Sequence, residues 1–148
     1  MIFSYVEAII PFNFGIPGVK LGLANVVSVI TLSMFGLIPT ILVVICRVVL
    51  AGLLFGNMYS IIYSLAGALL SVFIMLLVSK LKIFSIYGIS MCGGVFHNLG
   101  QLIVAVFVID QLKLSYYGPV LIISGLIMGY LIGLISNQVI KRVETYVR

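Results

Sequence analysis

Three side chains with strong hydrogen-bonding groups lie within one short segment, at His97, Asn98 and Gln101. His97 and Gln101 are four residues apart, so they share one face of a helix, and Asn98 lies one step around it. An imidazole and two carboxamides on one helical turn can line a polar cavity and bind a ligand. They can equally hold two helices together by hydrogen bonds. The sequence leaves both alternatives open.

A single cation, Arg47, is the second candidate, because it follows the apolar run 41–46 and precedes eight uncharged residues. An ionisable side chain deep in a membrane helix costs about 2.5–3.5 kcal/mol on insertion scales, so it persists where it is paired or used. Three interpretations remain. Arg47 forms a structural ion pair, with Glu7 as its partner; it contacts a ligand; or its side chain extends to the membrane surface.

Lys20 and Asn25 form the third candidate, beside the turn-forming pair Pro17-Gly18. The apolar pattern predicts a span that begins at residue 21, so this cation and this amide would stand at its outer mouth. A helix start at that place would offer free N–H groups and a positive dipole end, which suit an anionic group. The alternative is a lysine that lies among lipid headgroups.

Catalytic chemistry has little support in this sequence. Its three acidic residues are Glu7, Asp110 and Glu144, and a two-carboxylate site is hard to assemble from them. The sequence has no aspartate-rich pair of motifs that would hold magnesium and a diphosphate. It also has no Walker A loop and no GxSxG elbow. We therefore expect no enzyme activity, no metal site and no cofactor.

Composition decides which elements position these residues. Of the 148 residues, 64% are hydrophobic and 7% are charged, and the mean hydropathy is +1.39. Soluble domains carry about 25% charged residues, so this chain lacks the polar surface of a water-soluble fold. The composition excludes a soluble enzyme, a disordered tail and a disulfide scaffold, and predicts one transmembrane domain over residues 1–148. The net charge of +5 is spread too thinly for nucleic acid.

The apolar runs are continuous, which predicts membrane helices and not barrel strands, whose residues alternate in polarity. We expect an all-α integral membrane protein of about six transmembrane helices, of which the first, at 1–11, is truncated. The other predicted spans are 21–35, 40–55, 58–79, 83–109 with a glycine break at 93–94, and 119–140. The predicted connections are 12–20, 36–39, 56–57, 80–82 and 110–117, and a polar tail follows at 141–148.

The basic residues predict the topology. Lys80 and Lys82 lie in one connection, and Lys141, Arg142 and Arg148 follow the last span. Two spans separate these places, so both lie on one side of the membrane, and the positive-inside rule makes that side cytoplasmic. The connections 12–20, 56–57 and 110–117 then face outward.

Small residues and cysteines have plain structural interpretations. Gly125, Gly129 and Gly133 form a GxxxGxxxG stripe, and Ser60, Ser64, Gly67 and Ser71 lie close to a second stripe. Such stripes let helix backbones approach closely, and we favour packing inside the bundle over docking to a partner.

Cys46 and Cys92 fall in apolar runs, so we expect each to be a buried small hydrophobic residue.

Four ordered motifs carry a resemblance that covers nearly the whole chain: IPGVKLGLAN at 16–25, RVVLAGLLFGN at 47–57, YSLAGALLS at 63–71 and HNLGQ at 97–101. With them the chain resembles the Gx transporter family, which is often labelled heptaprenyl diphosphate synthase component I. That family is similar to the substrate-binding S components of energy-coupling factor transporters.

The resemblance implies a six-helix membrane protein that captures a small molecule from outside. Such a component docks on a transmembrane T component with two cytoplasmic ATPases, which would supply the ATP-binding motif that this chain lacks. Our leading hypothesis is a non-enzymatic, multi-pass binding subunit of a vitamin-type importer in the cell membrane. Its expected substrate-binding residues are Lys20, Asn25, Arg47, His97, Asn98 and Gln101. The alternative is a membrane accessory subunit for prenyl-quinone synthesis or flavin-linked extracellular electron transfer.

Overall fold

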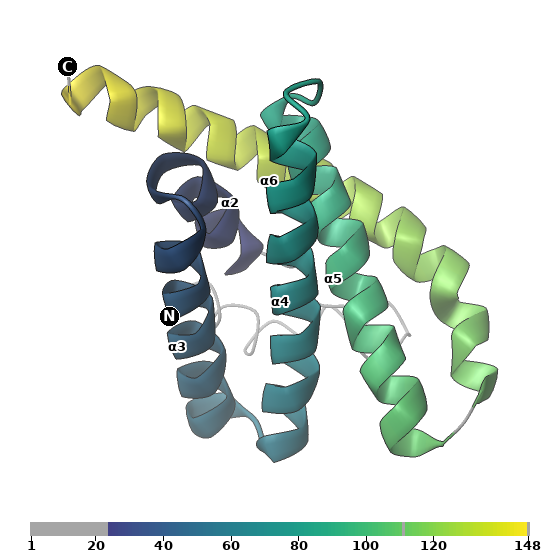
Figure 1. Ribbon diagram of the computed structural model, residues 1–148. Helices are drawn as coiled ribbons and strands as arrows, with labels where there is room; N and C mark the ends of the chain where they lie inside the picture. Colours follow the sequence, from purple (N-terminus) through teal and green to yellow (C-terminus); the bar gives the residue numbers. More distant parts are fainter. Residues whose placement is uncertain (1–23, 111, 148) are drawn as a thin grey trace.

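The apolar sequence folds into a bundle of helices (Figure 1). The computed structural model describes residues 24–110 and 112–147. Within those residues the chain forms α2 (Ala24–Phe35), α3 (Leu37–Phe55), α4 (Met58–Lys80), α5 (Ile86–Ile109), the 3-10 helix η1 (Leu112–Tyr117) and α6 (Gly118–Val147). Four of these described helices, α3 to α6, are long and apolar enough to cross a membrane. The chain is therefore an all-α, multi-pass membrane protein. The predicted half-span at 1–11 lies outside the described residues, so a total of six helices stays a prediction.

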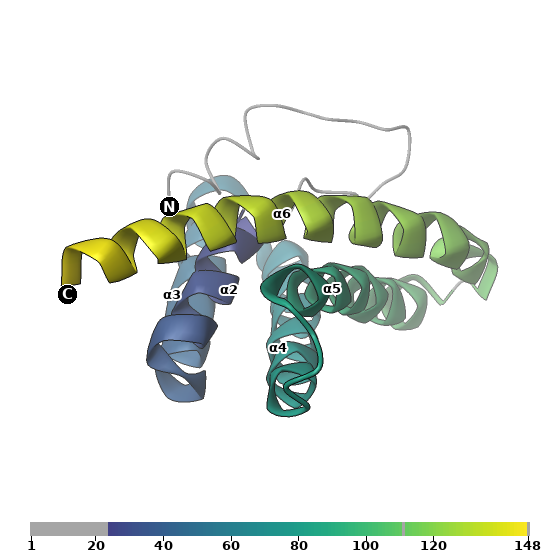
Figure 2. The ribbon, with the colours of Figure 1, turned by 90° about the horizontal axis from the view of Figure 1, so that it is seen from above.

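The helices differ in their inclination to the bundle. Figure 1 shows α3 and α4 standing upright side by side, α5 leaning away from α4, and α6 rising obliquely from one end of the bundle to the other. Viewed from above, α6 crosses the whole group (Figure 2). Valines, with a few other apolar residues from α2, α3, α4 and α6, form the core between them. The large hydrophobic side chains exposed on the outside suit a bundle that is solvated by lipid.

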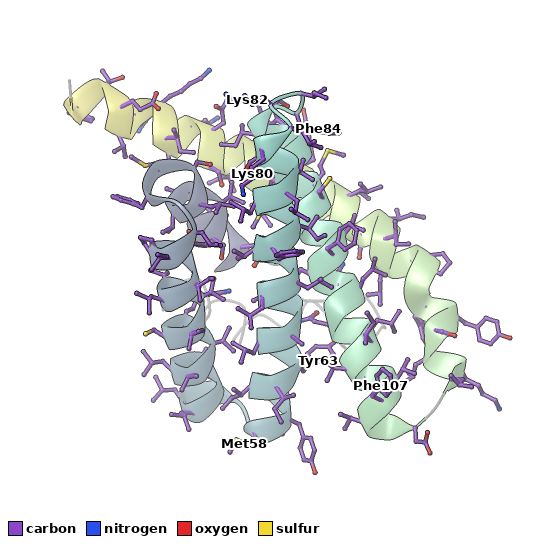
Figure 3. All side chains as sticks on the ribbon, viewed as in Figure 1. Met58, Tyr63, Lys80, Lys82, Phe84 and Phe107 are labelled. Carbon is purple, nitrogen blue, oxygen red and sulfur yellow. The ribbon has the colours of Figure 1, made fainter. Side chains whose placement is uncertain are left out.

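The two ends of the bundle differ in charge, as the topology prediction requires. The turn after α4, with Lys80 and Lys82, lies at the same end as the last turns of α6, with Lys141 and Arg142 (Figures 1 and 3). We call this the basic end; that it faces the cytoplasm stays a prediction of the positive-inside rule. The α3–α4 connection and η1 lie at the other end, which we call the outer end.

The turn predicted at 36–39 is much shorter than expected. Only Gly36 separates α2 from α3, and it adopts a φ of 82°, a left-handed conformation that favours glycine. The prediction treated Pro39 as part of the turn, but Pro39 lies in the first turn of α3. Proline is tolerated there because the N–H groups of a first turn have no partner within the helix.

The break predicted in the span 83–109 is also wrong. α5 runs without interruption from Ile86 to Ile109, and it passes through Gly93 and Gly94. A Cβ at Gly93 would lie 2.6 Å from the sulfur of Met75, and one at Gly94 would collide with the carbonyl oxygen of Gly125. These two glycines therefore let α4 and α6 approach α5, and they do not form a flexible hinge.

Both segments that were expected to be irregular near the C-terminus are largely helical. Most of the predicted loop 110–117 forms the 3-10 helix η1. Asp110, which ends α5 before it, adopts a left-handed conformation. The predicted tail continues α6 as far as Val147. α6 is therefore 30 residues long, or about 45 Å at the rise of an α-helix.

Asn57 fixes the start of α4 at the outer end. Its side-chain oxygen accepts a hydrogen bond from the N–H of Ser60 at 2.8 Å. We expect Asn57→Ala to lower the free energy of unfolding by about 1 kcal/mol, because the cap is lost. Asn57→Asp keeps an acceptor at this place and should melt like the wild type. Thermal unfolding in detergent measures both; equal melting of the alanine variant and the wild type would contradict the cap.

Candidate functional site

The candidate site is built on a contact between the backbones of α4 and α5. A Cβ at Gly100 would lie 2.9 Å from the Cα of Gly67. A Cβ at Gly67 would in turn lie 2.7 Å from the Cγ of Gln101 and 2.7 Å from the carbonyl oxygen of His97. The side chain of Gln101 therefore lies over the bare backbone of Gly67. The prediction that His97 and Gln101 share a face of one helix is confirmed, because both contact Gly67.

Gln101 is the member of this group with an unused hydrogen-bonding atom. Its side chain is only 2% exposed, and its carboxamide nitrogen Nε2 is buried without a hydrogen-bond partner among the described residues. A buried donor that stays unsatisfied costs about 1–3 kcal/mol. A ligand that carries a hydrogen-bond acceptor would remove that cost.

Asn98, unlike Gln101, forms hydrogen bonds to another helix. Its Nδ2 donates to the carbonyl oxygen of Leu121 at 2.9 Å and to the hydroxyl of Ser124 at 3.2 Å, both on α6. The side chain is 8% exposed. Asn98 thus holds α5 to α6. Of the two roles that the sequence left open, Asn98 has that of joining helices, whereas Nε2 of Gln101 has no hydrogen-bond partner among the described residues.

Arg47 lies at a depth in the bundle similar to that of Gln101. Arg47 comes eight residues before Phe55, the end of α3, and Gln101 comes eight residues before Ile109, the end of α5. Both helices end at the outer end, so each side chain lies about 12 Å along its helix from that end. Arg47 is half-buried. A cation and an amide donor therefore occupy the same level of the membrane.

Asn25 lies deeper than the sequence predicted. The prediction placed it at the outer mouth of a span, but the described part of α2, Ala24–Phe35, lies beside the half of α3 that is nearer the basic end (Figure 1). Asn25 precedes Gly36 by as many residues as Arg47 follows it, so both lie at a similar level. Asn25 is 6% exposed, which places it inside the bundle. Lys20 and Glu7 lie outside the described residues.

A second group of polar side chains between α5 and α6, buried or half-buried and nearer the basic end, was missed from the sequence. Nδ2 of Asn137 on α6 donates to the hydroxyl of Tyr87 on α5 at 2.6 Å. The hydroxyls of Ser90 and Ser136 are buried and have no hydrogen-bond partner within residues 24–110 and 112–147. A signal was present: Tyr87, Ser90, His97 and Gln101 follow one another at helical spacing along α5.

The small-residue stripes pack inside the bundle, which confirms the favoured interpretation. A Cβ at Gly125 would lie 2.8 Å from the Cα of Val95, and one at Gly129 would lie 2.6 Å from the Cα of Met91. On the second stripe, the hydroxyl of Ser71 donates to the carbonyl oxygen of Gly93 at 2.8 Å. These contacts fix α5 between α4 and α6, and so they position Gln101.

The cysteines differ in part from expectation. Both are free, Cys92 is half-buried, and Cys46 is exposed on the outer surface of α3. The prediction that Cys46 is buried is therefore wrong, because its position on the helix faces away from the core residues Val44 and Val48. In the membrane this side chain faces lipid.

The charges within the described residues set what the site can bind. The two described carboxylates are Asp110, at the outer end, and Glu144, on the last turns of α6. No group of three metal-ligating side chains occurs in the part of the chain that the structure describes. Gln101 on α5 instead offers an amide donor, and Arg47 on α3, at a similar depth, offers a guanidinium. Donors of this kind match an acceptor-bearing small molecule.

Comparison with known proteins identifies the family. The model of a family described as heptaprenyl diphosphate synthase component I matches residues 1–139. A search of curated proteins and a search of solved structures each found no match. Since the family model spans nearly all of the sequence, including every motif discussed above, the chain belongs to the heptaprenyl diphosphate synthase component I family.

Proposed function

We propose that this protein is the substrate-binding membrane subunit of an importer of the energy-coupling factor type, in the cell membrane. Its substrate is a small, vitamin-like molecule. The observation that carries the proposal is Gln101, whose buried Nε2 donor has no partner among the described residues. A buried carboxamide donor without a partner among the described residues is costly in a membrane helix, and this cost supports a contact with a ligand.

The site chemistry narrows the ligand. A carboxamide N–H and a guanidinium donate hydrogen bonds, so the ligand presents acceptors such as carbonyl or carboxylate oxygens. Asn25 and Arg47 lie at a level similar to that of Gln101 and serve as further contacts. His97 lies on the same face of α5, which contacts α4, and Asn98, one step around the helix, holds α5 to α6. Lys20, which lies outside the described residues, is proposed as a further contact or as part of a gate.

Import needs an energy source that this chain does not encode. The sequence has no Walker A motif, so we propose docking on a transmembrane T component with cytoplasmic ATPase subunits. Purification of the tagged chain from native membranes, with mass spectrometry of the proteins that accompany it, tests this. Recovery of ATPase subunits and a T component is the expected result.

The family's description favours a second candidate, a membrane accessory subunit for prenyl-quinone synthesis. It would hold a prenyltransferase or a flavoprotein at the membrane and bind a lipidic quinone. The same purification separates the two candidates. A prenyltransferase or flavoprotein in place of ATPase subunits would overturn the importer and support the accessory subunit.

We propose that the chain itself is not an enzyme. Prenyl diphosphate chemistry uses carboxylates that hold magnesium and diphosphate together. The sequence has three acidic residues, and the two within the described residues, Asp110 and Glu144, lie at opposite ends of the bundle. Diphosphate release by the isolated protein, given prenyl diphosphate substrates and magnesium, would contradict this.

A further inference from the structure

We propose that the basic end of the bundle binds the headgroups of anionic phospholipids, chiefly through Lys141 and Arg142 on the last turns of α6. This inference is independent of the transported substrate. Lys80, Lys82, Lys141 and Arg142 lie at this end with one acidic residue, Glu144, whereas the outer end carries Asp110 and Lys113. Among the described residues, the net positive charge is therefore concentrated at one membrane surface.

The geometry of α6 brings its basic residues to that surface. At about 45 Å, α6 is longer than the roughly 30 Å hydrocarbon core of a bilayer. Figure 2 shows that the helix crosses the bundle and continues past α2 and α3. Ile140 is the last buried side chain described on α6, and Lys141, Arg142 and Tyr146 after it are exposed. These last turns lie along the bundle end, where basic residues meet headgroups.

The turn between α4 and α5 indicates that the binding partner of the basic end is lipid. Lys80 and Lys82 alternate there with the exposed side chains of Leu81, Ile83 and Phe84, and Ile83 is 81% exposed. Figure 3 shows Lys82 and Phe84 together at this turn. Apolar side chains would be unfavourable in water, but beside lysines they suit the boundary between acyl chains and headgroups. Tyr146, 89% exposed, is also of a type enriched at that boundary.

Native mass spectrometry of the full chain, delipidated in detergent, tests the proposal. Phosphatidylglycerol and phosphatidylcholine with identical acyl chains are added in separate titrations. We expect tighter binding of phosphatidylglycerol by the wild type. The double variant Lys141→Gln, Arg142→Gln should lose about five-fold in affinity for each charge removed, with phosphatidylcholine binding unchanged. Lys113→Gln, at the outer end, is the matched control and should bind like the wild type.

Two results would overturn the proposal. One is equal affinity of the wild type for both lipids. The other is a double variant that keeps the preference for phosphatidylglycerol. If the lipid preference is absent while an acidic protein binds the wild type and not the double variant, the basic end is a protein interface. Binding of substrate is measured separately, so failure here leaves the proposed function standing, and the reverse also holds.

Discussion

Replacing Gly129 with alanine is expected to destabilise the protein by about 1–3 kcal/mol, because the added Cβ would overpack a helix contact. That Cβ would lie 2.6 Å from the Cα of Met91 and 2.7 Å from the carbonyl oxygen of Ser90. Both are backbone atoms of α5, so no side chain can rotate away. The two helices must separate, and thermal unfolding in detergent, followed by loss of the monomer peak on size exclusion, should show a melting temperature lower by several degrees.

Gly118→Ala is the matched control for this prediction. Gly118 is on the same helix, but a Cβ there would lie 3.7 Å from a side-chain carbon of Leu102, an ordinary contact. We expect this variant to melt close to the wild type. Equal melting of Gly129→Ala and Gly118→Ala would show that α5 and α6 are not packed as described.

Replacing Gln101 with leucine is expected to stabilise the ligand-free protein by about 1 kcal/mol and to abolish ligand binding. Leucine keeps a Cγ over Gly67 and removes the buried Nε2 donor that has no partner in the described residues. Removal of an unsatisfied buried polar group recovers its desolvation cost. The melting temperature should therefore rise while ligand binding is lost. This combination is expected of a residue that serves ligand binding at a cost in stability.

Asn98→Leu is the comparison for this prediction, because its melting temperature should change in the opposite direction. Asn98 donates hydrogen bonds to Leu121 and Ser124 on α6, and hydrogen bonds between membrane helices contribute about 0.6 kcal/mol each on average. Its loss should lower the melting temperature by an amount that corresponds to about 1 kcal/mol. Both variants replace a carboxamide on α5 with leucine, but Gln101→Leu should raise the melting temperature and Asn98→Leu should lower it. Destabilisation by both would mean that Gln101 is structural.

Sequence reasoning succeeded where composition and charge decide the structure. Continuous apolar runs predicted the long helices, and the placement of Lys80, Lys82, Lys141 and Arg142 at one end followed from the number of spans between them. The spacing of His97 and Gln101 predicted their common face. The glycine stripe on α6 predicted close packing within the bundle, which the contacts of Gly125 and Gly129 confirm.

It failed where an element depends on its neighbours. Gly93 and Gly94 were expected to break a span, yet they lie within α5 because α4 and α6 press against them. Asn25 was expected at a membrane surface, but it is buried inside the bundle at the level of Arg47. The sequence could not predict this depth, because it depends on how α2 packs against α3. The sequence could not predict that Asn98 contacts α6 while Gln101 contacts α4, because this depends on which helix lies on each side of α5.

The most direct test of the central claim, that the buried carboxamide of Gln101 binds a small molecule, is native mass spectrometry of the wild type and Gln101→Leu purified in parallel from the same membranes. We predict a small-molecule adduct on the wild type, at an occupancy about ten-fold lower or absent on the variant. Equal occupancy of the same adduct on both proteins, or a wild type without any adduct, would contradict the claim.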